Sequence, residues 1–219
     1  MRLSILTQHR YPYVVGSHLT LQLEDEATGC VSAKIAKLFE PFTISPIMQI
    51  YLDSPKHGLK GYMVLKLFDR RFAPNLRSEY KIPPWSSSIE QQYTAFVESG
   101  EIRDFIAFLN SGDDTNDNHW TDPAKDKAFL YDLCLDMYKT EKTVYDRLKD
   151  VQGKHVPSLL ACIKLKGYSP LPEPFDEFFD VPGTVFEYID GCQPNNAATH
   201  ILKESWQSSA MKPSKSSTF

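Results

Sequence analysis

The chain has 219 residues, of which 42% are hydrophobic, and its formal net charge is −4. Such a length and composition suffice for a folded domain with a substantial core. The acidic balance and the lack of a basic block argue against a nucleic-acid or anionic-membrane surface, so we expect small molecules or proteins as partners. No apolar segment has the length of a signal peptide or a membrane span, which predicts a soluble intracellular protein, cytoplasmic or nuclear.

The cysteines and histidines do not have the sequence spacing of a metal site. The four cysteines contain no C-x-x-C pair and the six histidines no H-E-x-x-H, so reduced thiols are expected and zinc is not. The acidic segment 111–118 resembles a calcium loop in composition. It lacks the required glycine, and Ala124 stands where the loop needs a glutamate, so a solvated loop is the expectation.

Six short stretches rich in β-branched and aromatic residues predict strands. They are residues 19–23, 31–39, 46–52, 62–68, 155–163 and 183–189. The first four follow one another through short turns, which indicates an antiparallel meander, and a proline-rich loop joins the last two. Residues 1–17 are expected to form an extended arm. Residues 197–206 can begin a short helix, and 208–219 have the serine- and lysine-rich composition of a flexible tail.

Helices are predicted between the fourth and fifth strands. An insertion at 73–121 contains a capping-box pattern at residues 88–91, which opens one helix, and a second helical piece at 102–109. A long helix is expected from about Asp122, where Asp122 and Pro123 form a good N-cap and first-turn pair, to about Gln152, with a glycine as the stop signal.

Two charged residues interrupt apolar patterns. Lys66 lies in the strand-like run 63–68, where alternation places Val64, Lys66 and Phe68 on one face. Glu141 lies on the apolar stripe of the long helix. The stripe consists of Leu130, Cys134, Met137, Tyr138, Glu141, Tyr145 and Leu148. Because an unpaired buried charge costs several kcal/mol, we predict that Lys66 and Glu141 lie in one core and pair with each other.

Three motifs around these residues resemble those of fungal protein-kinase-like proteins. They are VLKLFDRRF at 64–72, ExxxYDRLKDxQG at 141–153 and FEYIDG at 186–191. The similarity covers most of residues 18–207 and concerns the amino-terminal lobe of that fold. It implies an α+β fold, a kinase N-lobe-like twisted antiparallel sheet of about five strands packed on one long helix, with a helical insertion.

The resemblance also implies a nucleotide site with ATP as the candidate ligand. Lys66 is similar to the strand lysine that holds the nucleotide phosphates, and Glu141 to the helix glutamate that orients it. Phe186 stands at the gatekeeper position, and the Glu187 carbonyl and Ile189 N–H would face the adenine edge. From the residues alone, a structural ion pair and a plain core strand remain open alternatives.

Several departures from the kinase pattern argue against catalysis. Residues 39–46, where kinases have a glycine-rich loop, contain no glycine, and the insertion between Lys66 and Glu141 is unusually long. Neither a catalytic-loop aspartate nor a D-F-G motif occurs, and the segment after Gly191 is too short for a second lobe. No catalytic residue is therefore predicted.

The expected function is a catalytically incomplete, pseudokinase-type domain with at most weak nucleotide binding. Two alternatives stay open. One is a protein-interaction module without nucleotide, which binds a partner protein or a second copy through the face left open by the missing lobe. The other is a truncated product of a longer, active kinase-like phosphotransferase.

Overall fold

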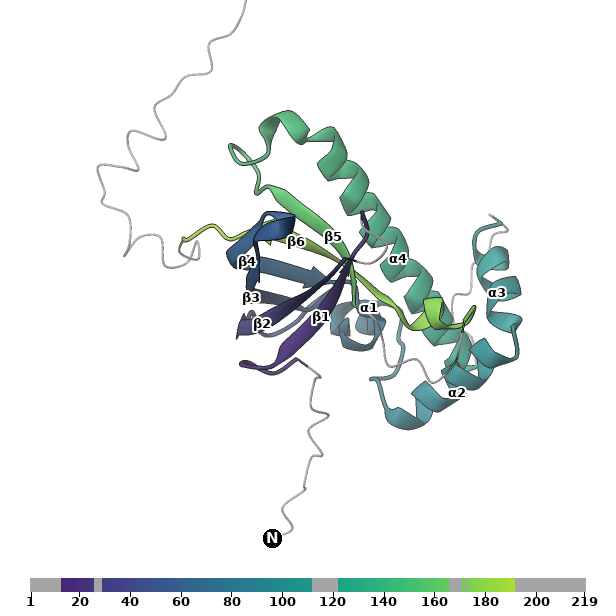
Figure 1. Ribbon diagram of the computed structural model, residues 1–219. Coiled ribbons are helices and arrows are strands. Elements are labelled where there is room, and N and C mark those ends of the chain that lie inside the picture. Colours follow the sequence, from purple (N-terminus) through teal and green to yellow (C-terminus); the bar gives the residue numbers. More distant parts are fainter. Residues whose placement is uncertain (1–12, 26–28, 112–121, 166–170, 172, 192–219) are drawn as a thin grey trace, which may run out of the picture. The chain divides into compact units, whose positions relative to one another are not determined.

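The sheet of this chain is a closed antiparallel barrel of six strands (Figure 1). The computed structural model describes residues 13–25, 29–111, 122–165, 171 and 173–191. The strands are β1 (His18–Leu23), β2 (Cys30–Leu38), β3 (Ile47–Ser54), β4 (Leu59–Leu67), β5 (Leu159–Leu165) and β6 (Val181–Glu187). Their order around the barrel is β1-β2-β3-β4-β6-β5, and pairing of β1 with β5 closes it.

Alternate side chains of the strands fill the barrel interior. In β4, Met63, Leu65 and Leu67 belong to the interior core, whereas Lys66 between them is partly exposed on the outer face. The glycine of β6, Gly183, lets β4 approach closely, because a Cβ there would stand 2.7 Å from the Lys66 carbonyl oxygen. The interior is therefore a packed apolar core.

Four α-helices of the described residues accompany the barrel. They are α1 (Pro74–Glu79), α2 (Ser87–Glu98), α3 (Glu101–Leu109) and α4 (Pro123–Arg147). Short 3₁₀ helices lie at η1 (Pro55–His57), η2 (Arg70–Phe72), η3 (Lys149–Val151) and η4 (Asp176–Phe179). Helices α2 and α3 pack against α4, and α4 also contacts β6 (Figure 1). The long helix thus bridges the barrel and the two insertion helices.

Two further apolar clusters lie outside the barrel. One joins α2, α3, the start of α4 and η4, with Tyr93 and Ile102 fully buried in it. The other joins α1 and the middle of α4 to the outer face of the barrel, with Phe68 and Leu130 as members. The helices are therefore held by apolar contacts of their own and do not share the barrel interior.

The predicted fold class is wrong. An open, kinase-like sheet of about five strands packed on one long helix was expected, but six strands close into a barrel whose core is its own interior. The closing contact pairs Leu21 with Leu165 and Leu23 with Ile163. Strand alternation shows which faces are apolar, but it does not show that strands so far apart in sequence become neighbours.

The individual elements lie close to their predicted positions. All six strand stretches contain a strand, although β5 begins at Leu159 and β6 ends at Glu187. Ser86 caps α2 by accepting from the Ile89 N–H, so the cap lies two residues before the predicted one. Asp122 caps α4 as expected, but α4 ends at Arg147. The segments 1–12, 112–121 and 192–219, with most of the predicted arm, the acidic loop and the tail, lie outside the described residues.

Candidate functional site

Lys66 and Glu141 form an ion pair across 75 residues of sequence, as the interrupted apolar patterns predicted. Lys66 Nζ donates to Glu141 Oε2, and the Lys66 ammonium also lies 4.9 Å from the centre of the Phe68 ring. The pair lies on the outer face of the barrel beside α4, with 24% and 19% of the two side chains exposed. The prediction that both charges lie inside one core is therefore wrong, because the barrel interior belongs to the neighbouring strand positions.

Thr184 completes this arrangement from the adjacent strand. It lies directly opposite Lys66 in the β4–β6 register, and its hydroxyl donates to Glu141 Oε1 over 3.0 Å. Each oxygen of the Glu141 carboxylate therefore has one donor. Because Thr184 is fully buried, its hydrogen bond anchors the carboxylate to the barrel independently of Lys66.

The other predicted site residues lie along β6 and just beyond it. Phe186, two positions after Thr184, packs on Tyr145 of α4 with ring centres 4.8 Å apart. Tyr145 follows Glu141 by one helical turn, so Phe186 borders the ion pair. Glu187 accepts from the Ser158 hydroxyl at 2.8 Å, and Ile189 is 59% exposed. The structure brings Lys66, Glu141 and Phe186 together, whereas the Glu187 side chain binds Ser158, just before the start of β5.

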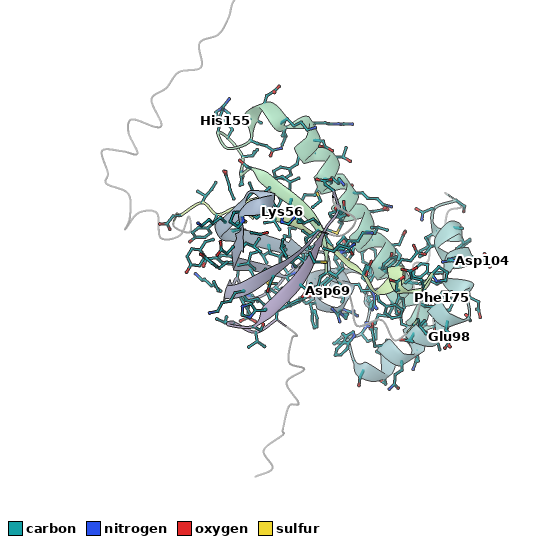
Figure 2. The ribbon with its side chains drawn as sticks, viewed as in Figure 1. Lys56, Asp69, Glu98, Asp104, His155 and Phe175 are labelled. Atoms are coloured by element: carbon teal, nitrogen blue, oxygen red, sulfur yellow. The ribbon has the colours of Figure 1, made fainter. Side chains whose placement is uncertain are left out.

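A cavity of about 320 Å³ lies beyond the end of β4, between the barrel and the helices. Its walls come from four parts of the chain, which are residues 68–71, the segment from Trp85 to α2, the middle of α4, and residues 179–182. None of the predicted site residues lines it. Figure 2 shows Asp69, one of its wall residues, among the side chains next to the barrel.

Two arginine–carboxylate forks build one side of this cavity. Arg70 donates from both Nη atoms to Glu90, over 3.0 and 2.5 Å, and its guanidinium lies 3.9 Å from the centre of the Tyr93 ring. Arg71 donates from Nε and Nη2 to Asp69, over 2.9 and 2.8 Å. Bidentate pairs of this kind fix both geometry and charge. The Arg70–Glu90 fork joins η2 to α2, whereas the Arg71–Asp69 fork fixes the turn between β4 and η2.

The carboxylates of both forks are held ionised. Burial by itself raises the pKa of Asp69, but the charge and hydrogen bonds of Arg71, together with the Tyr13 hydroxyl at 2.6 Å, lower it below its ordinary value. Burial likewise raises the pKa of Glu90, but the charge and hydrogen bonds of Arg70, with a hydrogen bond from Trp85, outweigh burial and lower this pKa below its ordinary value. Both acids therefore stay negative at neutral pH.

Lys127 is the most deeply buried amine of the described residues. Its side chain is 1% exposed, and its Nζ has no hydrogen-bond partner there. Burial, with the positive charges of Arg77 and Arg70, lowers its pKa to about 6. Arg77 itself donates to the Pro83 and Arg70 carbonyl oxygens. With this pKa the Lys127 amine is mostly neutral at physiological pH, because burial, followed by the positive charges of Arg77 and Arg70, disfavours its charged form.

Sequence reasoning missed this network, although one member had a readable signal. Lys127 stands three and seven residues before Leu130 and Cys134, so it extends the apolar stripe that identified Glu141. The run 69–71 gave no such signal, because adjacent charges are typical of solvated turns. Glu90 lies inside the capping-box pattern at 88–91 and showed no signal of its own, and no local pattern joins it to Arg70.

The described residues contain no group of three or more His, Cys, Asp or Glu side chains placed to hold a metal ion. Every helix among them is too short or too polar to span a bilayer. The sequence matches no protein-family model, no curated protein and no solved structure.

Proposed function

We propose that this chain is a non-catalytic binding domain in which the Lys66 ammonium contacts the phosphates of a nucleotide, with ATP as the candidate ligand. The observation that carries the proposal is the Lys66–Glu141–Thr184 arrangement, which holds one lysine with a partly exposed side chain in a defined position on the barrel. A fixed cation with an accessible side is a suitable contact for an anionic group.

The surroundings of Lys66 support a nucleotide more than a simple anion. Phe186 and Tyr145 form an aromatic pair one helical turn from Glu141, and aromatic faces stack on bases. The Lys66 charge is already partly neutralised by Glu141, so phosphate must compete for it and the affinity is expected to be low. The two free buried thiols, Cys134 and Cys162, agree with a reducing intracellular compartment, which is part of the proposal.

Thermal unfolding with ATP tests this proposal. For a Kd of about 1 mM, ATP at about 5 mM adds about 1 kcal/mol of stability. For a chain of this size the expected rise in Tm is about 2–4 °C. The Lys66→Met variant should lose this rise, because its side chain keeps the length but not the charge. The Lys60→Met variant is the matched control, since Lys60 is an exposed lysine of the same strand. Absence of a rise in the unmodified chain, or an equal rise in Lys66→Met, would contradict the proposal.

A second candidate function is self-association, favoured by exposed tyrosines on the outer face of the barrel. Tyr51 and Tyr62 are cross-strand partners with ring centres 5.4 Å apart, and they are 39% and 58% exposed. Tyr188, which follows β6, is also exposed. Tyrosine is favoured in interfaces, and a twofold contact between two copies buries the same patch twice.

Light scattering over a concentration series tests this second candidate. The average mass should rise with concentration toward that of a dimer, and Tyr62→Ser should keep the chain monomeric. Phe108→Ser, which removes an exposed ring from α3, is the control and should associate as the unmodified chain does. A constant monomer mass, or equal association of the Tyr62→Ser variant, would exclude this role for the tyrosines.

A further inference from the structure

The cavity between the barrel and the helices differs from the proposed nucleotide site, because Lys66, Glu141 and Phe186 do not line it. The two sites are neighbours, since Phe68, whose ring centre lies 4.9 Å from the Lys66 ammonium, forms part of the cavity wall. We propose that it binds a small, planar, uncharged aromatic heterocycle that carries a hydrogen-bonding edge. This inference does not rest on the nucleotide proposal, and each can fail without the other.

The size and walls of the cavity favour a flat ring system. Its volume of about 320 Å³ is at the small end of ligand pockets. Aromatic side chains line it from four segments, namely Phe68, Trp85, Tyr131 and Phe179. Rings of this kind offer planar surface at low conformational cost, and they pack well against another ring. The remaining apolar walls, such as Leu135 and Val181, complete a pocket for an apolar body.

The charges of the lining exclude a strongly anionic ligand. The two guanidinium groups, of Arg70 and Arg71, are each engaged in a bidentate pair with a carboxylate of the same lining. Asp180 adds a third carboxylate to the wall. A phosphate or carboxylate ligand could contact a guanidinium group only by displacing its carboxylate partner. Breaking that ion pair costs more free energy than the new contact with the ligand gains.

Polar groups that remain available define the hydrogen-bonding edge. The fork of Arg71 uses Nε and Nη2, which leaves Nη1 as a donor without an acceptor among the described residues. The side chain of Gln91 also lines the cavity. It has no hydrogen-bond partner among the residues that the structure describes. A guanidinium donor beside an amide, which both donates and accepts, matches a lactam-like edge of a heterocycle.

The ion-pair network also prepares the cavity for a ligand. A buried ion pair is seldom more stabilising than apolar residues of the same volume, so stability alone gives no reason for two such pairs around one cavity. The Arg70–Glu90 fork joins two of the cavity walls, and the Arg71–Asp69 fork fixes one of them. Tyr13 donates to the Asp69 carboxylate and Trp85 to the Glu90 carboxylate. A preformed wall lowers the ordering cost of binding.

Quinazolin-4-one, an uncharged bicyclic lactam, is the probe, and naphthalene-2-carboxylate is its anionic counterpart. Binding is followed by the indole N–H resonance of Trp85 in two-dimensional NMR spectra, assigned with Trp85→Phe. We expect quinazolin-4-one to shift this resonance with a Kd of about 0.1–1 mM, and the anion to bind at least about tenfold more weakly. The charge comparison needs no substitution in the cavity.

Matched tryptophan substitutions on α2 locate the site. Gln91→Trp places a ring into the cavity and should weaken quinazolin-4-one binding at least about tenfold, measured by saturation-transfer NMR. Gln92→Trp, at the adjacent exposed position that does not line the cavity, should leave it unchanged, as should Lys66→Met. No shift of the Trp85 resonance, equal or tighter binding of the anion, or equal weakening by both tryptophan variants would overturn the proposal. A loss of binding in Lys66→Met would place the ligand at the other site and would also contradict it.

Discussion

Lys66 and Thr184 face each other across strands β4 and β6, and both donate to the carboxylate of Glu141. The ion pair is therefore part of a three-residue connection that ties the C-terminal half of α4 to two neighbouring strands. This relationship explains how a partly exposed pair can still keep a fixed geometry, because the buried hydroxyl holds the carboxylate while the ammonium meets solvent.

Removing the carboxylate should destabilise the fold by an intermediate amount. Glu141→Ala strands a partly buried ammonium and an anchored hydroxyl, so we expect a loss of about 1–3 kcal/mol in the free energy of unfolding, between the values for exposed and buried pairs. Urea denaturation measures it. Glu141→Gln keeps an acceptor for Thr184 and should lose less. A loss as large as that of a fully buried pair would mean that solvent does not reach Lys66.

The Arg70–Glu90 fork should show strong coupling in a double-mutant cycle. Glu90→Gln leaves the buried Arg70 guanidinium without its charged partner and should cost about 3–5 kcal/mol, whereas Arg70→Met leaves the partly exposed Glu90 carboxylate unpaired and should cost about 1–3 kcal/mol. The double variant should cost clearly less than the sum of both, with a coupling energy of about 1–3 kcal/mol from urea denaturation. Glu90→Gln retains an acceptor for the Trp85 N–H, so the cycle isolates the ionic part. Additive losses would show that the two charges are stabilised independently.

The buried Lys127 amine should make stability depend on pH. Its pKa is about 6 in the folded chain against an ordinary value of 10.5, so between these values the unfolded chain holds one more proton. Stability therefore rises with pH in this window, by at most about 1.4 kcal/mol per unit, and the cost of burying the group is largest below pH about 6.

Lys127→Met, which is similar in volume and carries no charge, should remove this dependence. The variant should be more stable than the unmodified chain at neutral pH, and the difference should shrink as the pH rises from about 6.5 to 9. Chemical denaturation at several pH values measures this difference. If the difference stays constant across the range, Lys127 keeps its proton in the folded chain.

Gly183 should tolerate no side chain. A Cβ at this position would lie 2.7 Å from the Lys66 carbonyl oxygen and 2.8 Å from a methyl carbon of Leu67. Because backbone cannot move aside cheaply in a closed barrel, Gly183→Ala should cost at least about 2 kcal/mol in a thermal or urea unfolding experiment. Gly191→Ala is the control, since a Cβ there meets nothing within 4 Å. Equal stability of both variants would mean that β4 and β6 separate easily.

The Lys66–Glu141 contact was predictable because each residue breaks an apolar pattern, and the cost of an unpaired charge requires a partner. Thr184 was not predictable, since a threonine is an ordinary strand residue on either face of a sheet. Lys127 could have been found by extending the helical stripe one turn. The cavity and its arginine forks could not, because Arg70 and Glu90 are joined by no sequence periodicity.

By itself the sequence determined the order and the approximate bounds of the strands and long helices, because period-two and period-3.6 patterns depend only on neighbouring residues. It also determined that Lys66 and Glu141 pair, because each charge interrupts an apolar pattern. Only the tertiary structure decided that β1 pairs with β5 to close a barrel, that the ion pair lies outside that barrel, and that a cavity forms beside Arg70 and Arg71. These features depend on contacts between distant segments, whose partners no local pattern specifies.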